Sequence, residues 1–377
     1  MDAGQSSLSP TTSFDRDRHV RFLKMMFHGL PSGYQEQEIN HLTLAYFVIS
    51  GLDIFGALDQ VALVWSPIHI GEQTRPMTVF QRGFMPVDKE EIANWVLSFQ
   101  ARPKSKADLE NGQFYGFHGS RTSMFPPDSS NVLIHNNSHL ASTYCALAIL
   151  KIVGYNLSSI DPDSILISMK NLQQPDGSFM PIHTGAEADL RFVFCAAAIC
   201  FVLNNWSGID REKAKDYILN CQSYDGGFGL VPGSESHGGA TYCAVAALRL
   251  MGFIEDDLLS KMTSSSIINV PLLLEWSLQR QTIGGGLQGR PNKASDSCYA
   301  FWVGGVLKIL GAHKFLDKEA LCEFLLTCQS QYGGFSKFPG QLPDLYHSFY
   351  AMSAFSLLEE PDLKSLCVEL GVTDFAA

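Results

Sequence analysis

The sequence predicts an all-α protein built from repeated helical hairpins. Glycine-rich turns recur about every fifty residues, at 171–179, 220–229, 280–289 and 327–336, and self-similarity at such a period is typical of repeat architectures. Each turn follows a segment of helical character and precedes a helix-like segment rich in Ala, Cys and Leu. The chain has 377 residues, 46% of them hydrophobic, which is enough to bury a large core.

The segments between these turns divide into two kinds. A looser copy of the repeat covers 136–154, where a small-residue apolar helix is expected to end at Gly154. Apolar stretches such as 193–203 and 243–250 offer solvent no polar face, so we expect them to form an inner layer, with charged stretches such as 211–223 forming an outer layer. Such hairpins make either an open solenoid or a closed ring, and the periodicity does not choose between them.

Composition and charge exclude several functions. A net charge of −11 leaves no basic stripe for a phosphate backbone, so we expect no nucleic-acid partner. The longest apolar run, 193–203, is well short of the ~20 residues that cross a bilayer as a helix. The first residues lack the apolar segment of a secretory signal peptide. Asp2 stands where N-myristoylation needs a glycine. Nine cysteines lie singly, which fits a reducing compartment. We therefore expect a cytoplasmic protein without stable membrane insertion.

Polar residues return at a fixed distance from the repeated glycines. Eleven positions separate Gly226 from His237, Gly285 from Asp296 and Gly333 from Asp344. Arg191, Cys298, Tyr299 and His347 lie near the same offset, each at the expected start of an inner helix. Closing the hairpins into a ring would gather these side chains at one mouth, and this convergence favours the closed arrangement.

Asp296, Cys298 and His347 form a candidate metal-ligand set. The first two are separated by one residue, a spacing that brings both side chains together at the entry turn of a helix rather than within it. Three protein ligands of these types leave zinc an open fourth position, the pattern of a catalytic site. The alternative interpretation is an Asp that caps a helix beside a buried Cys.

Basic residues adjoin this set and form a candidate diphosphate site. The stretch 289–299 supplies Arg290, Lys293 and Tyr299, and the neighbouring repeat supplies His237. An Arg offers a bidentate fork to phosphate oxygens and a Lys offers a point charge. The alternative is a solvated turn without a ligand.

Four motifs together resemble the β subunits of protein prenyltransferases, most closely those of the type I geranylgeranyltransferases. They are ADLRFVFCAAAICFVLNNWSGID, SYDGGFGLVPGSESHGGATYC, GRPNKASDSCYAFWVG and GGFSKFPGQLPDLYHSFY. The resemblance implies an α-α barrel, or toroid, of inner and outer helices that forms a heterodimer with a separate α subunit. It also implies one Zn²⁺ per β subunit, held by Asp296, Cys298 and His347.

The resemblance assigns roles to further residues. It implies that the isoprenoid diphosphate contacts His237, Arg290, Lys293 and Tyr299, and that Arg191, His139 and Ala141 contact the substrate peptide. Lys337 stands where farnesyltransferases carry an Asp that helps bind magnesium, so its ammonium can replace that charge and magnesium is not expected to be required. Thr43 stands where farnesyltransferases place a Trp, which leaves room for a fourth isoprene unit, and Tyr350 lies where type I enzymes tend to have Phe in the isoprenoid pocket.

The implied reaction transfers geranylgeranyl from its diphosphate to the cysteine of a C-terminal CaaX motif, with X often Leu, in proteins such as small GTPases. A farnesyltransferase or a Rab geranylgeranyltransferase β subunit is the alternative within the family. A terpene cyclase would need an acidic D-x-D-D-like donor, and the nearest sequence is DPDS at 161–164. A non-catalytic helical-repeat binding protein is the alternative from another class.

The resemblance also sets the expected domain boundaries. We expect a flexible N-terminus at 1–20, the prenyltransferase barrel domain at 21–358 and a C-terminal tail at 359–377. Two stretches without helical periodicity, 64–86 and 264–271, are expected to be loop insertions, and the first is unusual for the family.

Overall fold

The structure is a computed structural model that describes residues 13–60, 88–123, 138–255, 267–374 and 376–377. The expected insertion at 64–86 therefore lies outside the described residues, as do the first twelve residues of the expected flexible N-terminus. None of the described helices is long and apolar enough to cross a membrane.

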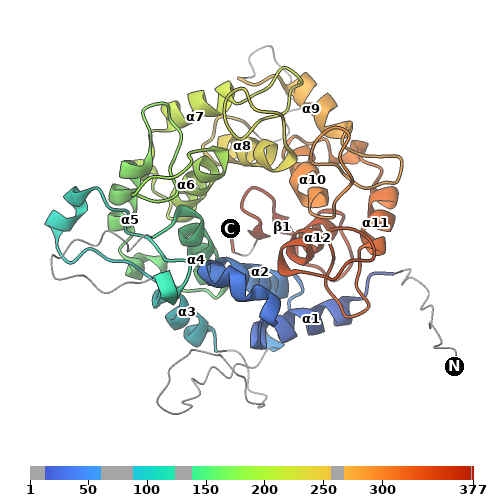
Figure 1. Ribbon diagram of the computed structural model, residues 1–377, viewed down its shortest axis with the longest axis horizontal. Helices are drawn as coiled ribbons and strands as arrows, with labels where there is room; N and C mark the ends of the chain where they lie inside the picture. Colours follow the sequence, from blue (N-terminus) through green and yellow to red (C-terminus); the bar gives the residue numbers. More distant parts are fainter. Residues whose placement is uncertain (1–12, 61–87, 124–137, 256–266, 375) are drawn as a thin grey trace.

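The chain forms a closed α-α barrel with two concentric layers of helices (Figure 1). The inner layer consists of α2 (His41–Ile54), α4 (Leu140–Ile152), α6 (Leu190–Val202), α8 (Gly238–Leu250), α10 (Tyr299–Ile309) and α12 (Leu345–Leu357). The outer layer consists of α1 (Arg16–His28), α3 (Lys89–Leu97), α5 (Pro162–Met169), α7 (Arg211–Asn220), α9 (Val270–Leu278) and α11 (Lys318–Thr327). Each inner helix packs against the next, and α12 also packs against α2, so the ring is closed. The predicted all-α barrel is confirmed.

Short 3-10 helices and one small hairpin complete the fold. The 3-10 segments are η1 (Ser32–Asn40), η2 (Leu58–Gln60), η3 (Lys106–Asn111), η4 (Arg121–Ser123), η5 (Leu157–Ile160), η6 (Lys170–Leu172), η7 (Trp206–Gly208) and η8 (His313–Phe315). Strands β1 (Leu366–Cys367) and β2 (Val372–Thr373) pair in antiparallel fashion.

Burial follows the predicted division into layers. On α6 every residue from Leu190 to Cys200 except Arg191 is buried, whereas α7 buries only Ala214, Tyr217 and Ile218. Helix α4 ends at Ile152, and Gly154 adopts a positive φ of 76° just beyond it, as the sequence predicted.

The glycine turns dock on the outer helix of the following hairpin. A Cβ atom added at these glycines would lie 2.0 to 2.3 Å from backbone atoms of that helix: Gly177 against α7, Gly226 against α9, Gly285 against α11 and Gly333 against α1. A glutamine from the same turn bonds to the N-cap of that helix. In Gln281, Oε1 accepts from the backbone N–H of Asp317 at 3.0 Å and Nε2 donates to its carbonyl at 2.8 Å. Gln173 makes the same pair of bonds with Asp210.

The last turn closes the ring onto the first helix. Gln329 accepts from the backbone N–H of Asp15 at 3.1 Å and donates to the carbonyl of Ser13 at 3.1 Å. The buried His19 accepts from the backbone N–H of Gly334 through Nδ1 at 3.0 Å, and its Nε2 lies 2.8 Å from Gln329 Oε1. Because Nδ1 is an acceptor, Nε2 carries the ring proton and donates it to Gln329.

Both ends of the described chain differ from expectation. Helix α1 begins at Arg16 with Asp15 as its N-cap, so the last residues of the expected flexible segment 1–20 are helical and contact the core. The expected tail 359–377 enters the ring, where the hairpin β1–β2 lies near the centre of the barrel (Figure 1). Its apolar residues Val368, Leu370 and Val372 are buried, which provides the driving force for this placement.

Gly285→Ala should destabilise the fold by at least about 2 kcal/mol, because φ is +82° and the new methyl would lie 2.1 Å from the Ala320 carbonyl oxygen. Gly304→Ala is the matched control, since its Cβ meets nothing within 4 Å and α10 gains a better helix former. Urea unfolding of both variants measures the difference. Equal stabilities would contradict the docking role of the turn.

His19 should make stability depend on pH. Burial lowers its pKa to about 4, so the folded state binds fewer protons than the unfolded state, and stability is lost as pH falls from about 6.5 towards 4. In His19→Gln, the loss of unfolding free energy between pH 6.5 and 5 should shrink by about 2 kcal/mol. Gln281→Ala removes an equivalent turn contact without a titrating group, and should lower stability equally at both pH values. An unchanged pH profile in His19→Gln would refute this role.

Candidate functional site

The N-termini of the inner helices lie at one end of the barrel, which is called the mouth. Side chains of His139, Asp189, His237 and Asp344 cap α4, α6, α8 and α12 by accepting from first-turn backbone N–H groups. Asp296 does the same just before α10, where its Oδ1 accepts from the backbone N–H of Cys298 at 3.0 Å. The eleven-residue offset in the sequence therefore corresponds to a capping position that also faces the mouth.

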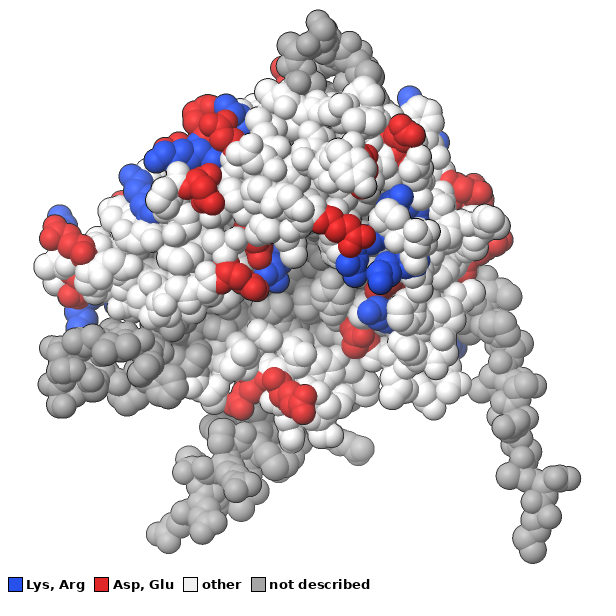
Figure 2. All heavy atoms as spheres, turned by 45° about the horizontal axis from the view of Figure 1, so that its top comes forward, with Lys and Arg blue, Asp and Glu red and all other residues white. Residues whose placement is uncertain are grey.

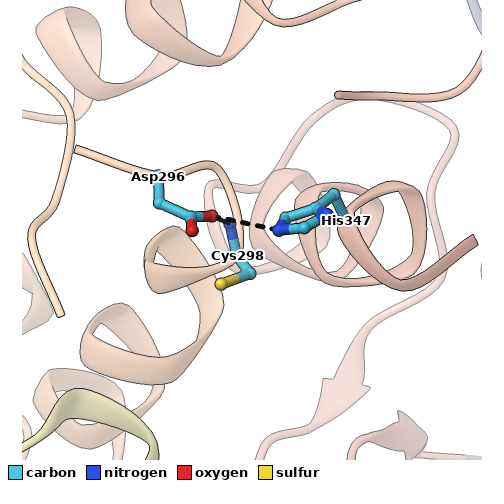
Figure 3. Close-up of side chains that lie close together, drawn as sticks. All are labelled: Asp296, Cys298 and His347. Carbon is cyan, nitrogen blue, oxygen red and sulfur yellow. Dashed lines mark hydrogen bonds and ion pairs between the residues drawn. The ribbon is translucent and has the colours of Figure 1, made fainter. Parts of the chain in front are cut away.

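The structure brings the three predicted metal ligands together (Figure 3). Cys298 directly precedes α10 and His347 lies in the first turn of α12, and one ligand atom from each of Asp296, Cys298 and His347 lies within 4.8 Å of the other two. His347 Nε2 is 3.4 Å from Asp296 Oδ1. Asp296 and Cys298 are only 5% and 3% exposed.

Asp296, Cys298 and His347 influence one another's pKa values. Burial lowers the pKa of His347, but its contacts with the carboxylates of Asp296 and Asp344 outweigh that effect and raise the pKa to about 9. Burial would raise the pKa of Asp296, yet hydrogen bonds from His347 and from the Cys298 backbone hold it below its usual value. Burial, together with the Asp296 carboxylate, raises the pKa of the Cys298 thiol.

The donor set fits a transition-metal cation. A carboxylate, a thiol and an imidazole are ligands of the kind that bind such cations, and a cation among them would replace the proton of the thiol. His347 Nδ1 lies 2.6 Å from Asp344 Oδ2, which fixes the ring so that Nε2 points towards Asp296 and Cys298. The arrangement can therefore hold a metal with three protein ligands.

Asp344 is the supporting residue that the sequence reasoning did not include in the site. Asp344 follows Gly333 by the same eleven residues as the other polar positions. That spacing does not reveal that the Asp344 carboxylate both caps α12 and contacts the His347 ring. A second such residue is Glu235, whose carboxylate lies 2.9 Å from Arg290 Nη1.

A basic cavity of about 270 Å³ adjoins the metal ligands. Its lining residues are Gly289, Arg290, Lys293, Ala294, Asp296, Tyr299, Lys337 and Phe338. Figure 2 shows a hollow on this face with Lys and Arg side chains gathered along one side. Lys337 Nζ lies 3.8 Å from Asp296 Oδ2. The positive charge of this cavity residue therefore acts directly on one of the predicted metal ligands.

His237 and Tyr299 form a hydrogen-bonded pair at this cavity. The Tyr299 hydroxyl lies 3.0 Å from His237 Nε2, while His237 Nδ1 accepts from the backbone N–H of Gly239. His237 therefore donates from Nε2, which leaves the Tyr299 hydroxyl proton available for a ligand. Gly289 is required beside the pair, because a Cβ there would lie 2.0 Å from Tyr299 Cζ.

The predicted peptide contacts lie on α4 and α6, across the ring from α10 and α12 (Figure 1). His139 caps α4 by accepting from the backbone N–H of Ala141 at 3.1 Å, and burial lowers its pKa to about 4. Arg191 pairs with Asp189 at 2.6 Å and with Glu187 at 2.8 Å. These residues therefore form a separate part of the mouth.

The two predicted isoprenoid-pocket residues face the interior of the ring. Thr43, in the first turn of α2, lies 3.8 Å from Cys145 Sγ on α4. The Tyr350 ring on α12 lies 4.3 Å from the Trp302 ring and 5.9 Å from the Phe47 ring. The structure thus places both among apolar inner-helix side chains.

Comparisons with known proteins agree with this architecture. The family model of the prenyltransferase alpha-alpha toroid domain matches residues 14–372. The chain is 61% identical to geranylgeranyl transferase type-1 subunit beta of Arabidopsis thaliana over 98% of this chain and 92% of that protein. It is 32% identical to the protein of the same name from Dictyostelium discoideum over 96% of each chain.

A solved structure shares the fold. It is the Candida albicans protein geranylgeranyltransferase-I complexed with GGPP, which matches with a TM-score of 0.76 over 97% of each chain at 23% sequence identity. The match extends to nearly the full chain, so both the barrel and the C-terminal segment belong to one architecture.

Proposed function

Because the chain belongs to the prenyltransferase α-α toroid family, we propose that it is the catalytic β subunit of a type I protein geranylgeranyltransferase. It transfers a geranylgeranyl group from the diphosphate to the cysteine of a C-terminal CaaX motif. The observation that carries the proposal is the convergence of Asp296, Cys298 and His347 beside a basic cavity at the mouth of an apolar barrel.

The metal proposed for this site is Zn²⁺, one ion per β subunit. Asp296, Cys298 and His347 would hold it, and a fourth position would remain for the substrate cysteine. The chemistry that zinc supplies when bound is the stabilisation of the substrate thiol as thiolate. Asp344 keeps the His347 ring in the orientation that this ligand set requires.

The residues of the basic cavity act on the leaving group. The sulfur–C1 bond forms as the C1–oxygen bond breaks, the diphosphate takes the electron pair, and the thiol proton passes to solvent. Arg290 and Lys293 stabilise the negative charge that develops on the diphosphate, while Tyr299, oriented by His237, donates its hydroxyl proton in a hydrogen bond. Lys337 supplies the positive charge for which farnesyltransferases use magnesium.

The remaining predicted residues contact the two substrates. Thr43 and Tyr350 would line the isoprenoid pocket, and Arg191, His139 and Ala141 would bind the peptide across the mouth. The proposed partners are a prenyltransferase α subunit and CaaX proteins such as small GTPases, in the cytoplasm. The proposed catalytic domain is the α-α toroid, whose family model matches residues 14–372.

Co-expression with a type I prenyltransferase α subunit tests the function. The heterodimer should transfer geranylgeranyl in preference to farnesyl to a peptide ending in Leu, with zinc and without magnesium. Lys337→Ala should lower kcat/KM by about 100-fold or more with little change in lipid affinity, because the charge it meets develops during bond breaking. Lys308→Ala, at the far end of α10, is the matched control. A preference for farnesyl would identify the alternative family member, and absence of transfer by a zinc-loaded heterodimer would overturn the proposal.

Metal analysis tests the ligand assignment. After dialysis the heterodimer should retain one equivalent of zinc, and Cys298→Ala should weaken zinc binding by at least about 100-fold, since one of three protein ligands is lost. Cys243→Ala removes a buried thiol on α8 outside this set, and should keep its zinc. Full zinc occupancy in Cys298→Ala would remove that residue from the site.

A further inference from the structure

Four inner helices are tethered at their N-termini to the loop that leads into the next inner helix. The residue that follows the capping residue donates its backbone N–H to a carbonyl four positions beyond the positive-φ glycine of the next turn. These bonds run from Leu140 to Pro181, from Leu190 to Leu230, from Gly238 to Gly289 and from Ser297 to Lys337, at 2.8 to 3.2 Å. The last tether therefore holds the backbone of Lys337, the cavity lysine that adjoins Asp296.

Ser297 adds a second bond that the other three tethers lack. The residues at the corresponding position, Leu140, Leu190 and Gly238, have no hydroxyl group. Ser297 Oγ donates to the carbonyl of Ser336 at 2.8 Å. Ser297 is fully buried and Ser336 is only 2% exposed, so water does not compete for this bond. The loop that carries Lys337 is thus held by one side-chain bond more than its counterparts.

Ser336 holds the same loop from the opposite side. Its backbone N–H donates to the Cys328 carbonyl at 3.0 Å. Its Oγ lies 3.1 Å from that carbonyl oxygen and 2.7 Å from the carbonyl oxygen of Phe338. Cys328 directly follows α11, so these contacts join the loop to the outer layer, whereas Ser297 joins it to the start of α10. Residues 336–338 are called the lysine loop.

The Lys337 side chain extends from this fixed backbone into the basic cavity. Nζ lies 3.8 Å from Asp296 Oδ2 and 5.1 Å from the centre of the Phe338 ring. Because a lysine carries its charge on a flexible stem, the position of its backbone decides which part of the cavity the ammonium can reach. A charge stabilises a leaving group best when it is already in place before the bond breaks. Movement of the lysine loop would therefore weaken catalysis.

We propose that Ser297 is a positioning residue for prenyl transfer, whose hydroxyl fixes the lysine loop so that the Lys337 ammonium lies beside the diphosphate as the C1–oxygen bond breaks. This inference rests on the proposed function, in which Lys337 acts on the leaving group. The hydroxyl bonds to a neighbouring repeat, whereas Asp296 accepts from the backbone N–H of Cys298. Loss of the hydroxyl should therefore affect Lys337 and leave the metal ligands in place.

A double-mutant cycle in heterodimers with the α subunit tests this role. The variants are Ser297→Ala, Lys337→Ala and the two combined, while Ser297→Thr keeps a hydroxyl on the same carbon. Ser277→Ala is the control, because it removes an equally buried hydroxyl that bonds within α9. For each variant we would measure the single-turnover rate constant of geranylgeranyl transfer, the affinity for geranylgeranyl diphosphate, bound zinc and amide hydrogen exchange of 335–339.

Ser297→Ala should lower the rate constant about tenfold and leave lipid affinity within about twofold, because the charge is needed during bond breaking. It should keep its zinc, and exchange in the lysine loop should become at least about threefold faster. In the Lys337→Ala background the same change should lower the rate no further, because the lysine through which the hydroxyl acts is gone. Ser297→Thr should restore the rate, and the control should match the wild type.

A second variant loosens the lysine loop from its other side. Ser336→Ala removes the Oγ contacts with Cys328 and Phe338, and should lower the rate only when Lys337 is present. Equal losses with and without Lys337, a wild-type rate in both serine variants, or loss of zinc from Ser297→Ala would overturn the positioning role and leave the proposed function standing. A zinc-loaded wild-type heterodimer that transfers no lipid would overturn both.

Discussion

The close approach of each glycine turn to the backbone of the next outer helix is the constraint on which the rest of the molecule depends. At Gly177, Gly285 and Gly333 a side chain would overlap a carbonyl oxygen, so neighbouring hairpins meet at a fixed distance. Glutamines such as Gln281 fix the same contact by satisfying the first backbone groups of the outer helix. Repetition of one hairpin-to-hairpin geometry turns the array into a ring and directs every inner-helix N-terminus to the same mouth.

The candidate site uses positions that the fold already requires. Each inner helix needs an acceptor for its first backbone N–H groups, and Asp296, His237 and Asp344 meet that need while facing the mouth. Helix N-termini also favour negative charge, which suits a mouth that receives a diphosphate. A substitution at Asp296 or Asp344 would therefore disturb both the helix end and the ligand geometry.

The repeat, the two helix layers, the eleven-residue offset and the grouping of Asp296, Cys298 and His347 could be predicted from the sequence, because each depends on local periodicity. It did not predict that 359–377 enters the barrel. Strands of two residues give no alternating pattern, and the C-terminal segment is held by distant partners such as Tyr46 and Asp53. The contact of Asp344 with the His347 ring was also not predicted, because the position of Asp344 at the helix cap does not determine the rotamers of the two side chains.

Ring closure has a consequence for how the chain folds. The bonds from Gln329 to Ser13 and Asp15 join residues more than 300 positions apart, so α1 finds its final partner only after the last repeat has formed. Contacts of such long range slow folding, because the entropy of closing the loop is lost before the contact forms. Until then the growing array has an open edge at each end, with apolar inner helices exposed. The barrel should consequently pass through an aggregation-prone intermediate during synthesis, at the stage just before its two ends meet.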